Sequence, residues 1–100
     1  MSDKQNITIS IANQAPIPLS INRNDEEIFR QAEYSVNRLW LSWCNRYKTK
    51  SPSEVLAMVA FRFAELFYRT EANAQEAQDS MEAFEARLNE ILLDMGEPEK

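Results

Sequence analysis

The chain of 100 residues contains one glycine, one cysteine and no histidine. About seven glycines would be average, and glycine-rich phosphate loops are excluded. Without histidine there is no imidazole base and no Ser-His or Cys-His nucleophile pair. The single Cys44 excludes an internal disulfide and a zinc site of Cys and His ligands within one chain. We therefore expect no enzyme activity, no metal and no cofactor.

Charge and hydropathy restrict the partners. The chain has 11 basic and 16 acidic residues and a net charge of −5, which disfavours binding to nucleic acid or to an anionic membrane. Met1–Gln5 is polar, and no apolar signal segment follows it. The longest apolar run, Val55–Phe61, is far shorter than the ~20 residues of a membrane-spanning helix. A chain with one cysteine cannot form an internal disulfide, which is consistent with a reducing compartment. We therefore expect a cytoplasmic protein.

Two short segments with alternating apolar residues open the chain. The first covers residues 7–11 and the second covers residues 17–21, and Asn13–Pro16 between them has the composition of a turn. This pattern predicts a β-hairpin. An isolated hairpin is only marginally stable, so another element must cover its apolar face.

A first helix is predicted over residues 25–47. Asn24 and Glu27 have the spacing of a capping box, and apolar residues then recur at helical spacing on one face. Trp40 and Trp43 precede Arg46, Lys48 and Lys50 in the sequence, as they would in a nucleic-acid patch. Because the chain as a whole is acidic, we interpret the two tryptophans as part of the core face of this helix. The basic residues that follow them then lie at the negative end of the helix dipole.

The clearest local signal is Ser51-Pro52-Ser53-Glu54, a capping box with proline at the first helical position. No helix breaker follows before Gly96 and Pro98. Apolar or small residues recur in between with gaps of four and three, which is a heptad pattern. Its two seam positions are Leu56, Phe63, Thr70, Ala77, Phe84 and Ile91, and Ala60, Phe67, Ala74, Met81, Leu88 and Met95.

The length of this helix predicts self-association. From residue 52 to residue 95 it would span roughly 66 Å at ~1.5 Å per residue. A compact chain of this size would be only about 30–35 Å across, so a second copy must cover the distal helix. The expected interface residues are Leu56, Val59, Ala60, Phe63, Phe67, Met81, Phe84, Leu88, Ile91, Leu92 and Met95.

These elements predict an oligomeric α+β protein in which a small head precedes a long C-terminal coiled-coil helix. We expect a disordered N-terminus over residues 1–5 and a head over residues 6–69 that includes the start of the long helix. A coiled-coil oligomerisation segment over residues 70–95 and a tail over residues 96–100 complete the chain. Within the long helix, Glu65 and Arg69 have the i,i+4 spacing of a supporting ion pair.

The order of these segments resembles the ZapA family of bacterial cell division proteins, in its short form. The likeness covers about residues 6–95, and its most specific pieces are Ile21-Asn22-Arg23 with Asp25–Ile28, and Leu56–Ala60. The resemblance implies a small head, a long coiled-coil helix and homodimers that pair into antiparallel tetramers. It also implies binding to FtsZ, the tubulin-like division GTPase, and crosslinking of FtsZ filaments at midcell.

Four residues are candidate FtsZ contacts, three of them by their positions in this resemblance. Gln14 lies in the hairpin turn, where relatives carry a basic residue, and this sequence has Asn13-Gln14 there instead. Lys50 matches a basic linker residue, Glu54 matches an acidic residue of the head, and Arg23 is a further exposed candidate.

Other classes of function fit parts of the pattern. A coiled-coil holdase of the prefoldin type, or a generic oligomeric scaffold, would also combine helices with apolar distal surfaces. A DNA-binding antitoxin would use the N-terminal ribbon, but Thr8 and Ser10 on its polar face offer no positive charge.

Overall fold

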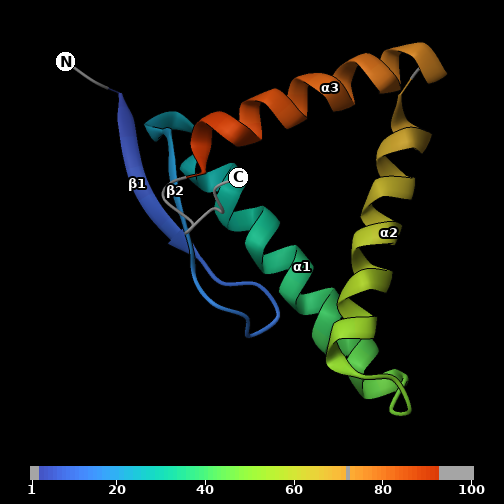
Figure 1. Ribbon diagram of the computed structural model, residues 1–100. Helices are drawn as coiled ribbons and strands as arrows, with labels where there is room; N and C mark the ends of the chain where they lie inside the picture. Colours follow the sequence, from blue (N-terminus) through green and yellow to red (C-terminus); the bar gives the residue numbers. More distant parts are fainter. Residues whose placement is uncertain (1–2, 72, 93–100) are drawn as a thin grey trace, which may run out of the picture.

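The computed structural model describes residues 3–71 and 73–92 as a hairpin followed by three helices (Figure 1). The α+β class predicted from the sequence is confirmed. The elements are β1 (Lys4–Ile9), β2 (Ile17–Asn22), a short 3-10 turn η1 (Arg23–Asp25), α1 (Glu26–Arg46), α2 (Pro52–Thr70) and α3 (Ala74–Ile91).

The predicted hairpin is confirmed. Its strands are antiparallel, with Ile7 opposite Leu19 and Ile9 opposite Ile17. Because side chains alternate between the two faces of a strand, this register places the buried Ile7 and Leu19 on one face. β1 begins at Lys4, so residues 4 and 5 belong to the strand and not to a disordered N-terminus.

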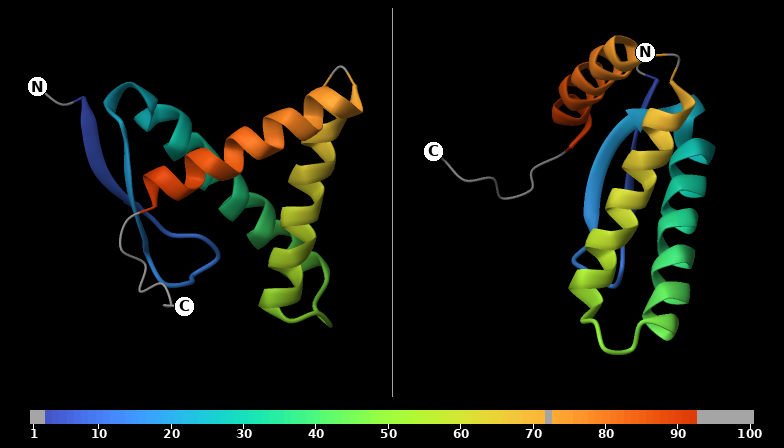
Figure 2. Two further views of the ribbon diagram at one scale, coloured as in Figure 1. Left: turned by 45° about the horizontal axis from the view of Figure 1, so that its top comes forward. Right: turned by 90° about the vertical axis from the view of Figure 1, so that its right-hand side faces the viewer.

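The helices give the molecule an extended shape. α1 and α2 run antiparallel, and α3 returns from the end of α2 towards the hairpin, so that the three helices outline a triangle (Figures 1 and 2). The Cα radius of gyration is 15.3 Å and the extents are 49 × 35 × 33 Å. A compact chain of this length would have a radius of gyration of roughly 13 Å.

The helix starts follow local capping chemistry. The capping box at α2 is confirmed, because Glu54 N–H donates to Ser51 Oγ at 3.1 Å and Ser51 N–H donates to Glu54 Oε1 at 2.8 Å. The predicted box of Asn24 and Glu27 is wrong. The Asn22 side chain instead accepts from Asn24 N–H at 3.1 Å and caps η1, which precedes α1.

Two small apolar clusters form the core. The hairpin cluster joins Ile7, Leu19 and Ile21 to Ile91 at the end of α3. The turn cluster joins Ala12 in the hairpin loop to Trp40 of α1 and to Val55 and Val59 of α2. Trp40 also donates its indole N–H to the Pro52 carbonyl oxygen at 3.1 Å. The turn cluster therefore holds the hairpin loop and both long helices together.

The single helix predicted from residue 52 to residue 95 is wrong within the described residues, because α2 ends at Thr70 and α3 begins at Ala74. Asn73 starts the new helix by accepting a hydrogen bond from Glu76 N–H at 2.8 Å. The return of α3 also buries Ile91 against the hairpin. By folding back, the chain itself buries part of the apolar surface that was expected to contact a second copy. Residues 93–95 lie outside the described part.

Candidate protein-binding surfaces

The hairpin loop is held in a fixed conformation. Ala12 and Asn13 have φ angles of 54° and 59°, and Gln14 N–H donates to the Ile11 carbonyl at 2.9 Å. Two consecutive positive φ values with this hydrogen bond define a tight turn of the type I′ class. Ala12 carries a Cβ into the left-handed region, which is unfavourable, so contacts outside the turn must stabilise it.

Asn37 of α1 supplies those contacts. Its Oδ1 accepts from Ala12 N–H at 2.7 Å, and its Nδ2 donates to the Ser10 carbonyl oxygen at 2.8 Å. One turn earlier on α1, Glu33 accepts from Ser10 N–H at 2.8 Å. Arg30 donates to the Thr8 carbonyl oxygen at 2.9 Å. These polar side chains of α1 therefore fix the segment that presents the hairpin turn.

We predict that Asn37→Ala lowers the free energy of unfolding by ~1–3 kcal/mol, because the partly buried Ala12 N–H loses its acceptor. Urea unfolding measures the loss, and amide hydrogen exchange at Ala12 should accelerate. The exposed Asn45, on the same helix, provides the control Asn45→Ala, for which we expect less than about 0.5 kcal/mol. Equal losses in both variants would contradict the role of Asn37.

Three of the four candidate FtsZ contacts lie towards one end of the molecule. Lys50 and Glu54 flank the start of α2, and Gln14 belongs to the loop whose Ala12 packs in the turn cluster beside that start. All three are exposed. We call this region, residues 13–14 and 46–54, the connector end.

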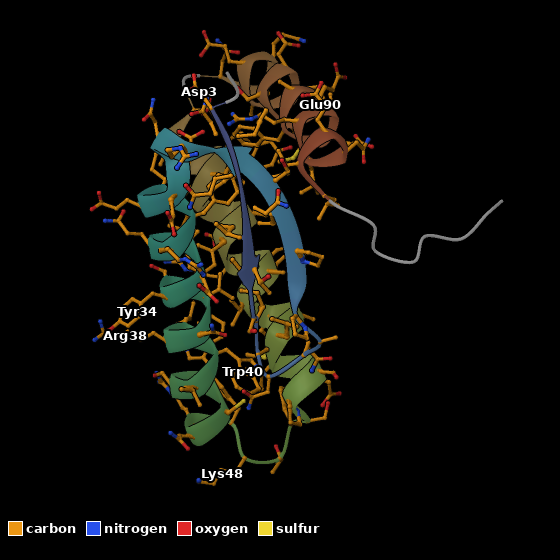
Figure 3. The ribbon with its side chains drawn as sticks, turned by 90° about the vertical axis from the view of Figure 1, so that its left-hand side faces the viewer. Asp3, Tyr34, Arg38, Trp40, Lys48 and Glu90 are labelled. Carbon is orange, nitrogen blue, oxygen red and sulfur yellow. The ribbon has the colours of Figure 1, made fainter. Side chains whose placement is uncertain are left out.

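Arg23 does not belong to the connector end. It is exposed in η1, and its backbone N–H donates to the Asp3 carbonyl oxygen at 2.8 Å beyond the open end of the hairpin. Figure 3 labels Asp3 at the opposite end of the molecule from Lys48. The structure therefore brings Gln14, Lys50 and Glu54 towards one end and leaves Arg23 at the other.

The connector end is also a basic part of an acidic chain. The connector end contains three basic residues, Arg46, Lys48 and Lys50, and one acidic residue, Glu54, whereas α3 contains five acidic residues and one arginine. Arg46, Lys48 and Lys50 are exposed, and Lys48 projects away from the connector (Figure 3). In the sequence, Arg46, Lys48 and Lys50 were interpreted as complementing the helix dipole, and Lys50 also as a contact that the family resemblance implies.

The predicted interface residues have unequal exposure. Val59 and Ile91 are buried within the chain itself, and Leu56, Phe67, Met81 and Leu92 are half-buried. Ala60 and Phe63 on α2 are exposed, as are Phe84 and Leu88 on α3. Met95 lies outside the described residues. Phe67 and Phe84 bring the two helices into contact, with their ring centroids 5.4 Å apart.

Further large apolar side chains are exposed where no interface was predicted. Phe61 on α2 is 75% exposed, and it lies beside Trp43, Ala57 and Met58 in a shallow apolar groove. On α1, Ile28, Tyr34 and Leu41 are exposed, and Tyr34 projects outwards next to Arg38 (Figure 3). The sequence did show that α2 is apolar on most sides, which was the available signal for Phe61.

Electrostatic pairing on α2 is local. The predicted pair is confirmed, because Arg69 Nε lies 2.8 Å from Glu65 Oε2, and Arg62 Nη1 lies 2.6 Å from Glu65 Oε1. Hydrogen bonds from Arg69 and then from Arg62 lower the pKa of the Glu65 carboxyl below its ordinary value. Such exposed pairs support a helix weakly.

In the described part of the chain, no group of three or more Cys, Asp or Glu side chains is arranged to hold a metal ion. Among the described helices, none is long and apolar enough to cross a membrane. The candidate surfaces that the described residues offer are the basic connector end and the exposed apolar faces of α2 and α3.

The family model for cell division protein ZapA matches residues 7–93 of this chain. No curated protein and no solved structure matches it. Since the family model covers most of the chain, the chain belongs to the ZapA family. Membership implies an FtsZ-associated role in bacterial cell division at the division site, and members of this family are not enzymes.

Proposed function

We propose that this ZapA family member crosslinks FtsZ filaments as a homodimer or homotetramer. The observation that carries self-association is the balance of apolar surface. Of the described residues, only nine hydrophobic side chains are buried, and nine large ones are exposed. Six of those nine lie on α2 and α3, namely Phe61, Phe63, Leu66, Tyr68, Phe84 and Leu88.

Exposed apolar surface of this extent favours a protein partner, because isolated soluble monomers rarely keep large apolar patches in water. The interface residues predicted from the heptad pattern include Ala60, Phe63, Phe84 and Leu88, all of which are open to a second copy. Aromatic residues in such a position typically dominate the energy of association.

The connector end is the proposed FtsZ-binding surface. Lys50 and Glu54 are held by the turn and the capping box that start α2, and Gln14 is presented by the turn that Asn37 holds. A rigid surface loses little conformational entropy on binding. Arg23, at the opposite end, would serve as a separate contact.

Multivalency would give these contacts their effect. A single weak contact to a filament becomes strong when a second copy holds another contact at a fixed distance, because the second binding event is then intramolecular. A dimer or tetramer with a connector end on each chain would link two filaments. In this mechanism the protein needs binding surfaces and no reacting group.

Co-sedimentation with polymerised FtsZ tests the proposal. We expect the wild-type chain in the pellet and Lys50→Glu to bind at least about tenfold more weakly, because it places a negative charge in the basic surface. Arg38→Glu makes the same charge change on the outer face of α1 and should bind as the wild type does. The absence of the wild-type chain from the pellet would refute FtsZ binding, and equal loss in both variants would refute the assignment of Lys50.

A further inference from the structure

The hairpin turn at the connector end carries no charge. Residues 12–15 are Ala-Asn-Gln-Ala, and Asn13 and Gln14 are exposed. The attraction of a charged group such as Lys50 extends over ~8 Å at physiological ionic strength. An amide side chain instead needs a partner atom at hydrogen-bond distance and in the right direction. Any contact that the turn makes with another protein therefore depends on the exact conformation of the turn.

The turn also positions its own exposed side chain. Gln14 Nε2 donates to the Ala12 carbonyl oxygen at 3.3 Å, and Gln14 N–H donates to the Ile11 carbonyl oxygen at 2.9 Å. Both the main chain and the side chain of Gln14 are thus bonded to the residues just before it. A change in the backbone angles of Ala12 would move the Gln14 amide.

Ala12 is the residue of the turn whose conformation needs support. Its φ of 54° is unfavourable for a residue with a Cβ. Its methyl group is buried in the turn cluster, and its N–H donates to Asn37 Oδ1 at 2.7 Å. Both interactions offset the unfavourable φ. The hydrogen bond also fixes the orientation of the peptide group that begins the turn.

Asn37 ends a row of α1 residues that bind the hairpin. The row has intervals of four, three and four residues, and it contacts β1 and the hairpin loop in sequence order. Its members are Glu26, Arg30, Glu33 and Asn37. Arg30 lies 3.7 Å from Glu26 Oε2 and 3.1 Å from Glu33 Oε1, so the first three members support one another. Asn37 is the member that bonds to the turn itself, beside the middle of α1 (Figure 1).

We propose that Asn37 is a positioning residue for FtsZ binding, because it holds the hairpin turn in the conformation that presents Gln14 to FtsZ. The apparent dissociation constant of a site is its intrinsic value divided by the fraction of molecules in the binding conformation. Loss of Asn37 lowers this fraction and leaves Gln14, Lys50 and Glu54 in place. This inference rests on the proposed FtsZ binding and adds a residue that acts through the turn.

Asn37→Ala should bind polymerised FtsZ about fivefold or more weakly in a co-sedimentation titration, because the Ala12 N–H loses its acceptor and the turn leaves its bound conformation. Circular dichroism establishes that the variant is folded. Sedimentation equilibrium should show unchanged self-association, so that the number of FtsZ contacts per particle stays the same.

A double-mutant cycle with Gln14→Ala tests whether Asn37 acts through the turn. Gln14→Ala alone should weaken FtsZ binding by a similar factor. Once Gln14 is removed, the further change Asn37→Ala should weaken binding less than about twofold, because the turn has no side chain left to present. Full additivity of the two losses would overturn the proposal, since a general loss of stability would add to that of Gln14→Ala.

Glycine at residue 12 should rescue the variant. Glycine adopts a positive φ without the penalty that a Cβ imposes, so the turn forms without Asn37. Asn37→Ala with Ala12→Gly should bind FtsZ about threefold or more tightly than Asn37→Ala alone, and Ala12→Gly alone should bind as the wild type does within about twofold. A double variant that binds no better than Asn37→Ala would contradict the positioning role.

Ile21→Val is the matched control for lost stability. Ile21 is 1% exposed in the hairpin cluster, opposite Gln5 near the open end of the hairpin. Removing one of its buried carbon atoms also lowers the free energy of unfolding and leaves the turn untouched. This variant should bind FtsZ within about twofold of the wild type. Equal losses of binding for Ile21→Val and Asn37→Ala would refute a specific role of Asn37.

The outcomes separate this inference from the proposed function. If the wild-type chain does not sediment with FtsZ, both are refuted. If the wild type binds, Lys50→Glu binds weakly and Asn37→Ala binds normally, then the positioning role is refuted and FtsZ binding by the connector end remains. Weak binding by Asn37→Ala that glycine at residue 12 restores supports the positioning role.

Discussion

Replacing Phe84 and Leu88 together with glutamine should leave the chain folded and abolish its self-association at micromolar concentrations. About half of each side chain is exposed in the single chain. Burying the exposed half of such a side chain contributes ~1 kcal/mol, which gives ~4 kcal/mol over two copies. The dissociation constant should therefore rise roughly a thousandfold. Glutamine is a good helix former, so α3 itself is preserved.

The matched control places the same residue on other faces of α3. Ala83→Gln with Ala86→Gln, both at exposed positions, should change the dissociation constant less than about threefold. Sedimentation equilibrium measures both double variants across a range of concentrations. If Phe84→Gln with Leu88→Gln associates as tightly as the wild type, the interface lies elsewhere, and the face around Phe61 becomes the candidate.

Trp40→Ala should unfold most of the protein near physiological temperature. Trp40 is 7% exposed and lies in the turn cluster against Ala12, Val55 and Val59. Loss of a buried tryptophan costs ~3–5 kcal/mol, and its indole hydrogen bond to Pro52 is lost with it. The total stability of a small domain is only ~5–15 kcal/mol, and the two clusters here are small.

Urea denaturation followed by circular dichroism measures this loss, with Trp43→Ala as the matched comparison. Trp43 is half-buried on the same helix and packs edge-on against Tyr47, with ring centroids 6.3 Å apart. We expect its loss to cost less than half as much. Equal costs would mean that the turn cluster is not the part of the core that holds the hairpin loop to the helices.

Local signals in the sequence predicted most of the fold. The capping box at Ser51, the alternation of the hairpin residues and the apolar spacing of α1 each depend on neighbouring residues, and each is confirmed. The end of α2 was missed because a heptad pattern shows only that a helix has an apolar face. It does not show whether a second copy or another part of the same chain buries that face. The spacing of Asn73 and Glu76 is typical of a helix start, and it was the signal in the sequence for a new helix at α3.

The candidate surfaces were less predictable. Gln14, Lys50 and Glu54 came from the family resemblance, and only the fold places them towards one end. No spacing rule connects residue 12 to residues 40 and 55, because those contacts depend on how the hairpin loop packs on α1 and α2. The exposure of Phe61 likewise depends on α1 covering one side of α2 and leaving the other open.

The side chains of α1 that bind the end of β1 and the start of the hairpin loop have a consequence for assembly. Arg30, Glu33 and Asn37 occupy main-chain groups of the segment from Thr8 to Ala12, where a further strand would otherwise pair. Unprotected strand edges on both sides of a sheet permit open-ended growth. On the other side of the hairpin, Leu92 forms an antiparallel bridge with Leu19 of β2. Both edges of the two-stranded sheet are thus partly occupied by the chain's own residues, which disfavours the addition of further strands edge to edge.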